Sequence, residues 1–324
     1  MTTLPHAVYG TVPRDLVEAD GASVQCSPRI PGAPVLADMP PASLSGLVVH
    51  APASTLERRS VLALALRSLA PGASLTAVAA NSKGGMRLAD ELTSFGCSVD
   101  VGHKRKHQIV RTTRSASMTG LDDAIAGGAP RLLPDLGLWS QPGLFNWDRI
   151  DPGSQLLLEH LPPLEGRGAD LGCGFGVLAR AVRLKPPCPN VILIDIDQRA
   201  LNMARRNVPG DGVTTLWADV RSAATLPSGL DFVVTNPPFH DEGEEDAALG
   251  QSFIQKAAAM LRPGGTLWLT ANRHLPYEAT LKPLFQSVDQ VATAHGFKIY
   301  AARKAPGSAA KGRSSTLRTA KARA

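Results

Sequence analysis

Hydrophobic runs of strand length alternate with helical patterns along the second half of the chain. Residues 166–182 pass from a short apolar run through glycines into a segment with a helical apolar period, and residues 190–208 repeat that order. Further apolar runs lie within residues 212–220, 229–239 and 250–272, the last after a helical segment. Strands that are apolar along their whole length are typical of a parallel sheet covered by helices on both faces. The pattern therefore predicts a doubly wound α/β domain.

The first half of the chain contains a weaker copy of this pattern. LAPGASLTAVAAN at residues 69–81 matches LRPGGTLWLTAN at residues 261–272 with one residue of slippage. KHQIVRTTR, which begins at Lys106, parallels GFKIYAARK, which begins at Gly296. A duplicated strand pattern predicts two related Rossmann-like domains with doubly wound, mostly parallel sheets.

The first copy lacks the polar residues that end one strand of the second copy. VVHAPAS at residues 48–54 has nearly the same offset as VVTNPPF at residues 233–239. This alignment sets small side chains against the amide, proline and aromatic residues of the second copy: Ala51, Ala53 and Ser54 against Asn236, Pro238 and Phe239. No DxGxGxG-like loop precedes the first copy, and the proline-rich stretch before Ser45 looks too short for a complete set of earlier strands. We therefore expect the N-terminal domain to be degenerate and shortened.

Composition is that of an ordinary globular protein. The chain has 324 residues, 44% of them hydrophobic, which is long enough for more than one domain. No apolar run approaches the ~20 residues of a membrane span, and the N-terminus lacks the regions of a signal peptide. The cysteines show neither paired nor ligand-like spacing, so we expect free thiols and no metal site: Cys26, Cys97, Cys173 and Cys188. These features predict a cytoplasmic protein.

The positive charge is concentrated near the C-terminus and in one internal cluster. The net charge is +6, and residues 303–324 contain basic and small residues but no acid, which is typical of a disordered tail. The internal cluster, HKRKH at residues 103–107, extends through Arg111 and Arg114. Each region can be a solvated surface or an electrostatic contact for nucleic acid. The sequence leaves both interpretations open.

Polar residues follow four successive predicted strands of the second domain. The first strand runs into DLGCGFG, the second ends at Asp195, the third at Asp219, and the fourth at NPPF. Because sheets of this type bind ligands beyond the carboxyl ends of their strands, we expect these groups to meet at one crevice. Glycines in the first loop can adopt positive φ and let a ligand lie against the backbone. Asp195 and Asp219 could instead cap helices, although Asp197 is the better placed cap.

These motifs resemble those of the class I S-adenosylmethionine-dependent methyltransferases, over residues 144–304. The resemblance implies that S-adenosylmethionine is the cofactor, that Asp195 holds its ribose and that Asp219 meets its adenine. It assigns the methionine and ribose side of the pocket to residues of the first loop, with Cys173 and Phe175 contributing backbone and packing to the cofactor site: Asp170, Gly172, Gly174 and Gly176. It assigns catalysis to the motif of enzymes that methylate exocyclic or amide nitrogens, with Asn236 also touching the cofactor: Asn236, Pro237, Pro238 and Phe239.

The NPPF motif suits the chemistry of the exocyclic amine of guanine. The lone pair of this amine is delocalised into the ring, so the nitrogen is a poor nucleophile. If the Asn236 side-chain oxygen and the Pro237 carbonyl accept its N–H groups, the nitrogen can pyramidalise and point its lone pair at the methyl group. The prolines fix the direction of these acceptors, and Phe239 can stack on the base. His240 is a candidate contact with no assigned role in proton transfer.

The duplicated arrangement resembles, more narrowly, the family of ribosomal RNA guanine-N2 methyltransferases that includes RsmC and RlmG. The match includes PGLFNWDRIDPGSQLLLEHL at residues 142–161 and ANRHLPY at residues 271–277. The first of these is expected to cross the cofactor pocket, unless Asp151 is only a helix cap. The resemblance implies methyl transfer to N2 of a guanine in ribosomal RNA, with the small subunit favoured, either as naked RNA or as an assembled subunit. The alternatives are an N-methyltransferase of a protein glutamine amide or of adenine N6, and a non-catalytic RNA-binding assembly factor.

The expected organisation combines the patterns and the resemblance. Its segments are a proline-rich N-terminal segment (1–44), a degenerate methyltransferase-like domain (45–130), a linker and helix over the cofactor pocket (131–160), a catalytic domain (161–304) and a basic disordered tail (305–324). We expect a monomer that binds neither a membrane nor a metal.

Overall fold

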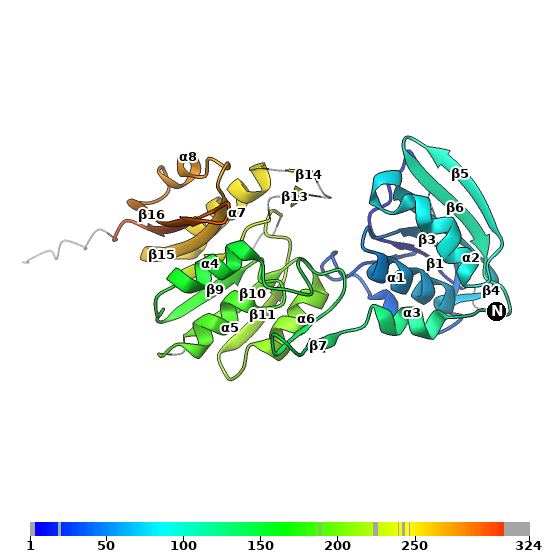
Figure 1. Cartoon of the computed structure of the whole chain (residues 1–324), viewed down its shortest axis with the longest axis horizontal. Helices are drawn as coiled ribbons and strands as arrows, with labels where there is room; N and C mark the ends of the chain where they lie inside the picture. Colours follow the sequence, from blue (N-terminus) through cyan, green and yellow to red (C-terminus); the bar gives the residue numbers. More distant parts are fainter. Residues whose placement is uncertain are drawn as a thin grey trace, which may run out of the picture.

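The chain folds into two α/β lobes that lie beside each other and are joined by a linker (Figure 1). The computed structural model describes residues 4–18, 21–187, 189–222, 226–238, 240–241, 244–245 and 247–307. Cys188, Phe239 and the basic tail beyond residue 307 lie outside the described residues. Each lobe contains one large sheet, of six strands in the first lobe and seven in the second. The prediction of two related α/β domains with mostly parallel sheets is confirmed.

The first sheet has a parallel part and an antiparallel edge. In sheet order its strands are β2 (Val24–Cys26), β1 (His6–Tyr9), β3 (Leu44–His50), β4 (Leu69–Ala80), β6 (His107–Thr113) and β5 (Val99–Lys104). The first four are parallel to one another. β6 is antiparallel to β4, and β5 is antiparallel to β6. The helical elements of this lobe are η1 (Leu36–Asp38), α1 (Thr55–Ser68), η2 (Asn81–Lys83), η3 (Gly85–Arg87), α2 (Leu88–Ser94) and α3 (Leu121–Gly127). Leu62 and Leu66 of α1 pack into the main core of this lobe with Leu47 and Leu75 of the sheet.

The second sheet has the same plan with one additional parallel strand. In sheet order its strands are β11 (Val213–Trp217), β10 (Asn190–Asp195), β9 (Arg167–Leu171), β12 (Leu230–Thr235), β15 (Leu261–Asn272), β17 (Phe297–Arg303) and β16 (Ser287–Ala294). The first five strands in this order, from β11 to β15, are parallel to one another. β17 is antiparallel to β15, and β16 is antiparallel to β17. Two short hairpins complete the strands, β7 (Arg131–Leu133) with β8 (Leu138–Ser140) and β13 (His240–Asp241) with β14 (Glu244–Glu245).

Helices cover both faces of the second sheet. On one face lie α4 (Pro152–His160), α5 (Val177–Leu184) and α6 (Gln198–Asn207), and on the other α7 (Ala247–Met260) and α8 (Glu278–Leu281). Leu193 and Val234 point into the core under α4, α5 and α6, whereas their neighbours Ile194 and Val233 point into the core under α7 and α8. Successive strand residues face opposite sides of a sheet, so strands buried on both sides must be apolar throughout. This requirement explains the continuous apolar runs of the sequence.

The hydrogen-bond registers of the two sheets match residue for residue except at the antiparallel edge, where β16–β17 has a register shift that β5–β6 lacks. The pairs Leu44–Leu69 and Gly46–Ser74 of β3 and β4, which flank a register shift, correspond to Leu230–Leu261 and Phe232–Thr266 of β12 and β15. The strands β4 and β15 both have 12 residues, so the slippage expected from the sequence is absent. The repeated strands themselves were predicted correctly.

The matching register corrects one equivalence drawn from the sequence. Counted from Leu44 and Leu230, the position of Asn236 in the second lobe is occupied by His50 in the first, not by Ala51. The sequence alignment was wrong by one residue because it matched valine to valine in strands where most residues are apolar. Hydrogen-bond pairing fixes the register in a way that a run of similar side chains does not.

The boundary expected after residue 44 is also wrong. The strands β1 and β2 lie before it, yet β1 pairs with β3 and belongs to the first sheet. The backbone N–H of Gly10 donates to the carbonyl of Cys26 at 3.0 Å, as that of Gly172 donates to Ile194 at 2.8 Å. These strands have four and three residues, which is too short for an apolar period to be visible among the prolines.

Candidate methyltransferase site

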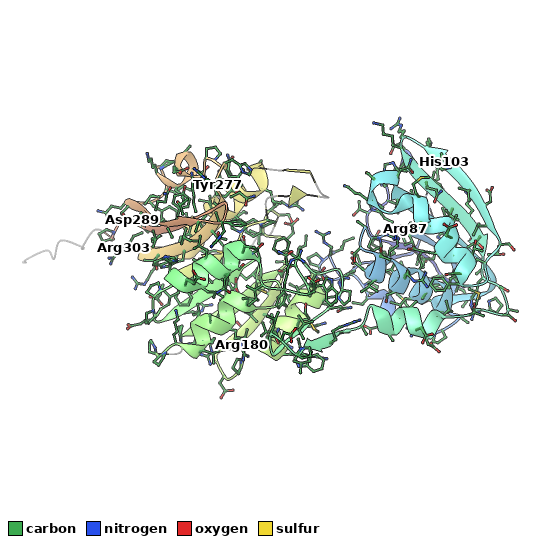
Figure 2. The ribbon with its side chains drawn as sticks, viewed as in Figure 1. Arg87, His103, Arg180, Tyr277, Asp289 and Arg303 are labelled. Carbon is green, nitrogen blue, oxygen red and sulfur yellow. The ribbon has the colours of Figure 1, made fainter. Side chains whose placement is uncertain are left out.

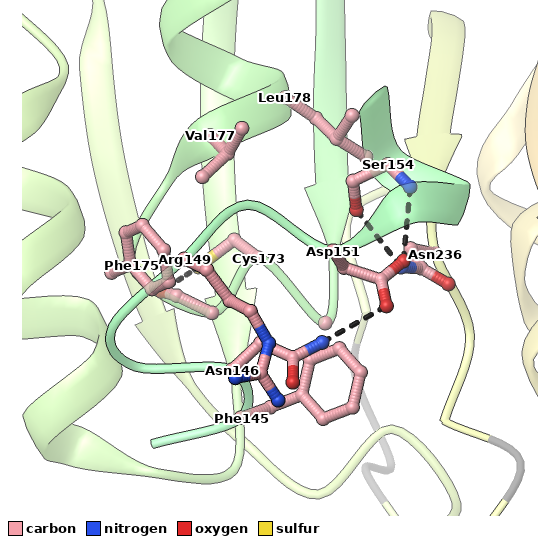
Figure 3. Close-up of a pocket in the computed structure, with 12 residues that line it drawn as sticks. Phe145, Asn146, Arg149, Asp151, Ser154, Cys173, Phe175, Val177, Leu178 and Asn236 are labelled. Atoms are coloured by element: carbon pink, nitrogen blue, oxygen red, sulfur yellow. Dashed lines mark hydrogen bonds between the residues drawn. The ribbon is translucent and has the colours of Figure 1, made fainter. Parts of the chain in front are cut away.

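A pocket lies at the carboxyl ends of the second sheet, where the linker crosses the glycine-rich loop (Figure 3). It is lined by residues of the linker and α4 (Phe145, Asn146, Arg149, Asp151 and Ser154), of the loop after β9 and the start of α5 (Gly172, Cys173, Gly174, Phe175, Val177 and Leu178) and by Asn236 after β12. The structure therefore brings together the first and fourth strand ends, as the sequence predicted. The linker residues Phe145, Asn146 and Arg149 were not predicted individually, since their types alone do not distinguish a pocket wall from an ordinary loop.

Asp170 holds the start of α5, directly after the glycine-rich loop that follows β9. This carboxylate is fully buried and accepts the backbone N–H of Ala179 at 2.9 Å through one oxygen. Its other oxygen, Oδ1, has no protein partner among the described residues. Burial raises the pKa of Asp170 to about 7, against the opposing effect of the Ala179 hydrogen bond and with a further contribution from the charge of Asp195. Asp170 thus supports the loop, and it does not line the pocket.

The loop requires glycine at more than one position. Gly172, Gly174 and Gly176 have φ values of 74°, 51° and 87°, in the region that other residues rarely adopt. A Cβ on Gly176 would lie 3.0 Å from the Cα of Ala204 on α6, so this glycine permits close helix packing. A Cβ on Gly174 would meet nothing within 4 Å, because this residue faces open space at the pocket. The loop therefore offers bare backbone to a ligand.

Asp195 at the end of β10 ties the second strand end to this loop. Its carboxylate accepts the N–H of Gly174 at 2.8 Å and that of Asp197 at 2.8 Å. Burial raises the pKa of Asp195 to about 6, although both hydrogen bonds favour the charged form. The N-cap of α6 is Asp197, whose carboxylate accepts the N–H of Arg199, so the alternative in which Asp195 caps the helix is wrong.

Asp219 is not among the residues that line the pocket. Its carboxylate accepts hydrogen bonds from the backbone and guanidinium of Arg221, at 2.9 Å and 3.1 Å for the shortest contact of each kind. Partial burial acts to raise the pKa of Asp219, but the hydrogen bonds from Arg221 outweigh it and lower the pKa. The described structure thus shows Asp219 engaged by its own loop.

The side chain of Asn236 is oriented by Asp151 and Ser154. Its Nδ2 donates to Oδ2 of Asp151 and to Oγ of Ser154, both at 2.9 Å (Figure 3). A carboxylate can only accept hydrogen bonds, so the amide must turn its NH2 group toward Asp151. The side-chain oxygen of Asn236 is then directed away from these partners as an acceptor.

Asp151 also caps α4, so it has both of the roles considered from the sequence. Oδ2 accepts the backbone N–H of Ser154 at 3.0 Å, and Oδ1 accepts Nδ2 of Asn146 at 2.9 Å. Asn146 has a φ of 44°, a left-handed conformation that asparagine tolerates better than most residues. Both Asp151 and Ser154 are buried, at 8% exposure. The cap, the linker turn and the amide of Asn236 therefore form one network.

Two prolines follow Asn236. Pro237 is buried and Pro238 is partly buried. His240 opens the short β13–β14 hairpin. Among the described residues, no group of three or more His, Cys, Asp or Glu side chains is arranged to hold a metal ion. No helix in the described part of the chain is long and apolar enough to cross a membrane.

Residues 135–301 match the family model described as Methyltransferase small domain. With the glycine-rich loop and Asn236 at successive strand ends, this match defines the second lobe as a small-domain methyltransferase. Among curated proteins, Ribosomal RNA small subunit methyltransferase C of Pseudomonas paraeruginosa is 31% identical over 88% of this chain and 87% of its own length. The protein of the same name from Shewanella loihica is 35% identical over 53% of this chain and 50% of its own length. The chain therefore belongs to the Ribosomal RNA small subunit methyltransferase C family, and the resemblance found in the sequence is confirmed.

A solved structure has the same two-lobed fold. It is the T. thermophilus 16S rRNA N2 G1207 methyltransferase (RsmC) in complex with AdoMet and guanosine. Its TM-score is 0.75 at 23% identity, with 94% of this chain and 89% of that chain covered. The duplicated architecture is thus shared by both chains over nearly their whole length.

Proposed function

We propose that this protein transfers a methyl group from S-adenosylmethionine to the exocyclic N2 of a guanine in ribosomal RNA, with the small-subunit RNA as the favoured substrate. Its similarity to proteins named Ribosomal RNA small subunit methyltransferase C, and to the T. thermophilus N2 methyltransferase solved with AdoMet and guanosine, supports the reaction and the substrate class. A ribosomal RNA substrate supports a cytoplasmic location for the enzyme.

The observation that carries the proposal is the orientation of Asn236. Its NH2 group is held by Asp151 and Ser154, so its oxygen is left to accept a hydrogen bond from the substrate. An exocyclic amine is a donor, and an acceptor on it favours pyramidal geometry and frees the nitrogen lone pair. The carbonyl of Pro237 is the proposed second acceptor, and Phe239 and His240 are the proposed contacts to the base. Orientation of the amine supplies most of the rate enhancement, an effect on the order of several kcal/mol.

The loop after β9 fits S-adenosylmethionine. Bare backbone at Gly174, beside the pocket residues Gly172 and Cys173, suits close approach of the methionine and ribose, while Gly176 sets the packing of the loop. Asp195 can accept the ribose hydroxyls, because each of its oxygens accepts one backbone N–H and retains further acceptor capacity. The cofactor supplies a methyl group on a positively charged sulfur.

Two carboxylates have less direct proposed roles. Asp170 supports the loop with an oxygen that has no partner in the described part of the chain. Asp219 contacts the adenine amine only after its carboxylate gives up some of the hydrogen bonds that it accepts from Arg221.

The test is a single-turnover assay with methyl-labelled S-adenosylmethionine. Naked small-subunit RNA, assembled small subunits and a release factor are the parallel substrates. We expect label in RNA only, recovered as N2-methylguanosine after digestion to nucleosides. Label in protein or in N6-methyladenosine would overturn the substrate, and no transfer to any substrate with bound cofactor would support an assembly factor instead.

A further inference from the structure

Asn207, the last residue of α6, is a buried amide that does not line the pocket. Its side chain is 2% exposed, although asparagine is mostly found at protein surfaces. Burial of an amide costs free energy unless its polar atoms form hydrogen bonds. Here the donor and the acceptor of the amide bind two segments that lie far from α6 in the sequence. These two partners show what the burial of Asn207 achieves.

The first partner is the linker between the lobes. Oδ1 of Asn207 accepts the backbone N–H of Trp139 on β8 at 2.7 Å, and Nδ2 donates to the carbonyl of the same residue, also at 2.7 Å. The amide thus pairs with both backbone groups of Trp139, as a neighbouring strand would. The guanidinium of Arg206 lies over the Trp139 ring, 4.7 Å from its centroid. These contacts hold the β7–β8 hairpin against the end of α6 (Figure 1).

The second partner is the glycine-rich loop after β9. Nδ2 of Asn207 also donates to the carbonyl of Phe175 at 2.8 Å, and Phe175 lines the pocket. The two N–H groups of the amide are therefore divided between the linker and the loop. Arg180 of α5, which Figure 2 labels in the second lobe, donates to the backbone carbonyl of Asn207 at 2.6 Å. The end of α6 is thus tied to the helix that follows the loop as well.

The two partners of Asn207 lead to different walls of the pocket. Phe175 belongs to the wall made by the loop, and the linker continues from Trp139 to Phe145 and Asn146 of the other wall (Figure 3). A small apolar core joins the loop, the linker and α6: Leu138, Leu144, Phe175, Ala200 and Met203. Apolar contacts are not directional, whereas hydrogen bonds require a defined distance and angle. The bonds of Asn207 therefore determine how one wall is placed against the other.

We propose that Asn207 is a positioning residue for the cofactor site and sets the spacing between the linker and the glycine-rich loop. The inference rests on the proposed function, because S-adenosylmethionine has to fit between these two walls. Asn207 acts through Trp139 and Phe175. Without its amide, a larger fraction of molecules has a detached linker, and cofactor affinity falls in proportion to the fraction that remains competent to bind.

The test compares Asn207→Leu with Asn202→Leu, which makes the same change at an exposed position of α6. Leucine is similar in size to asparagine but forms no hydrogen bonds with its side chain. In calorimetry, Asn207→Leu should bind S-adenosylmethionine at least ~10-fold more weakly, because the buried backbone groups of Trp139 and Phe175 lose their partner when the linker is docked. Asn202→Leu should keep the affinity of the unmodified protein.

Hydrogen exchange reports the linker directly, without RNA or turnover. In Asn207→Leu, residues 131–150 should exchange faster than in the unmodified protein, while the strands of the second sheet keep their protection. Saturating S-adenosylmethionine should slow this exchange again, because it favours the docked linker. The single-turnover rate at saturating cofactor should then approach that of the unmodified protein.

The outcomes distinguish positioning from a role in stability alone. A lower unfolding temperature with unchanged cofactor affinity, or linker exchange as slow as in the unmodified protein, overturns the proposal. If Asn207→Leu does not fold, Arg206→Gln removes an exposed contact with Trp139 and should accelerate linker exchange and weaken cofactor binding by a smaller factor. Unchanged values in Arg206→Gln would then overturn it. Weaker cofactor binding and faster linker exchange, with no N2-methylguanosine from the unmodified protein, would retain the positioning role and overturn the proposed reaction.

Discussion

Replacing Asp151 with serine should separate helix capping from catalysis. Serine caps helices about as well as aspartate, so α4 should keep its N-cap bond to Ser154. A serine side chain is too short to reach Asn236, whose amide would then retain only the hydroxyl of Ser154. A hydroxyl both donates and accepts, so it does not select which end of the amide faces the substrate. The variant should therefore fold normally and lose the orientation of Asn236.

The size of the effect follows from the bond that is lost. A hydrogen bond to a charged group contributes about 1.5–3 kcal/mol, and Asp151 is buried at 8% exposure, where solvent screens little. At about 1.4 kcal/mol for each tenfold change, methyl transfer should slow by roughly 10- to 150-fold. The free energy of unfolding should change by less than about 1 kcal/mol, because the cap remains.

The assay is the single-turnover rate at saturating cofactor and RNA, compared with Asp151→Asn. Asparagine keeps an oxygen where Oδ2 accepts from Ser154 and Asn236, provided that the Asn146 amide reverses to meet the new NH2 group. This variant should therefore recover most of the rate that Asp151→Ser loses. An equally slow Asp151→Asn would show that Asp151 acts through its charge, and a normal rate in Asp151→Ser would refute the orientation of Asn236 altogether.

Further predictions concern the motif, the cofactor site and the loop. Asn236→Ala should transfer methyl groups at least ~100-fold more slowly while binding cofactor and RNA nearly as before, as stopped reactions and calorimetry would show. The raised pKa of Asp195, about 6, means that the folded state binds a proton that the unfolded chain has lost, so this group's contribution to stability decreases as pH rises from about 4 to 6. Cofactor affinity should have the opposite dependence on pH and weaken as pH falls below about 6. Asp195→Asn should bind the cofactor weakly at every pH. Cofactor affinity that does not change with pH in the unmodified protein would contradict this prediction. Gly176→Ala should lower the free energy of unfolding by about 1–3 kcal/mol in denaturant titrations, because of its positive φ and the nearby Ala204.

The sequence predicted the parts of the fold whose signal is repeated or continuous. The apolar strands of the second lobe and the copy of β15 in β4 were visible because burial on both faces leaves no room for polar residues. The same uniformity concealed the register, so His50 was missed as the counterpart of Asn236. The short strands β1 and β2 were missed because three or four residues carry too little pattern.

The candidate site was predicted where side-chain chemistry follows a strand, and less well where it depends on the linker. Gly172, Gly174 and Asn236 line one pocket, as expected from the shared edge of parallel strands. Asp151 was considered either as a cap or as part of the pocket wall, since sequence spacing does not show that one carboxylate serves both α4 and Asn236. The bond between Asp219 and Arg221 depends on a local turn that the sequence does not specify.

The first lobe shows which parts of the second lobe are not needed to assemble a sheet with this strand order. No helix occurs among the described residues between β1 and β2, whereas α5 lies between β9 and β10 in the second lobe. The first sheet nevertheless keeps the Gly10–Cys26 hydrogen bond and the same strand order. The sheet of the first lobe therefore assembles without a crossover helix between these two strands and without the later glycines of the loop. In the second lobe Gly174 lines the pocket and Gly176 packs against α6, so a substitution at Gly174 should weaken ligand binding more than stability, whereas one at Gly176 should lower both.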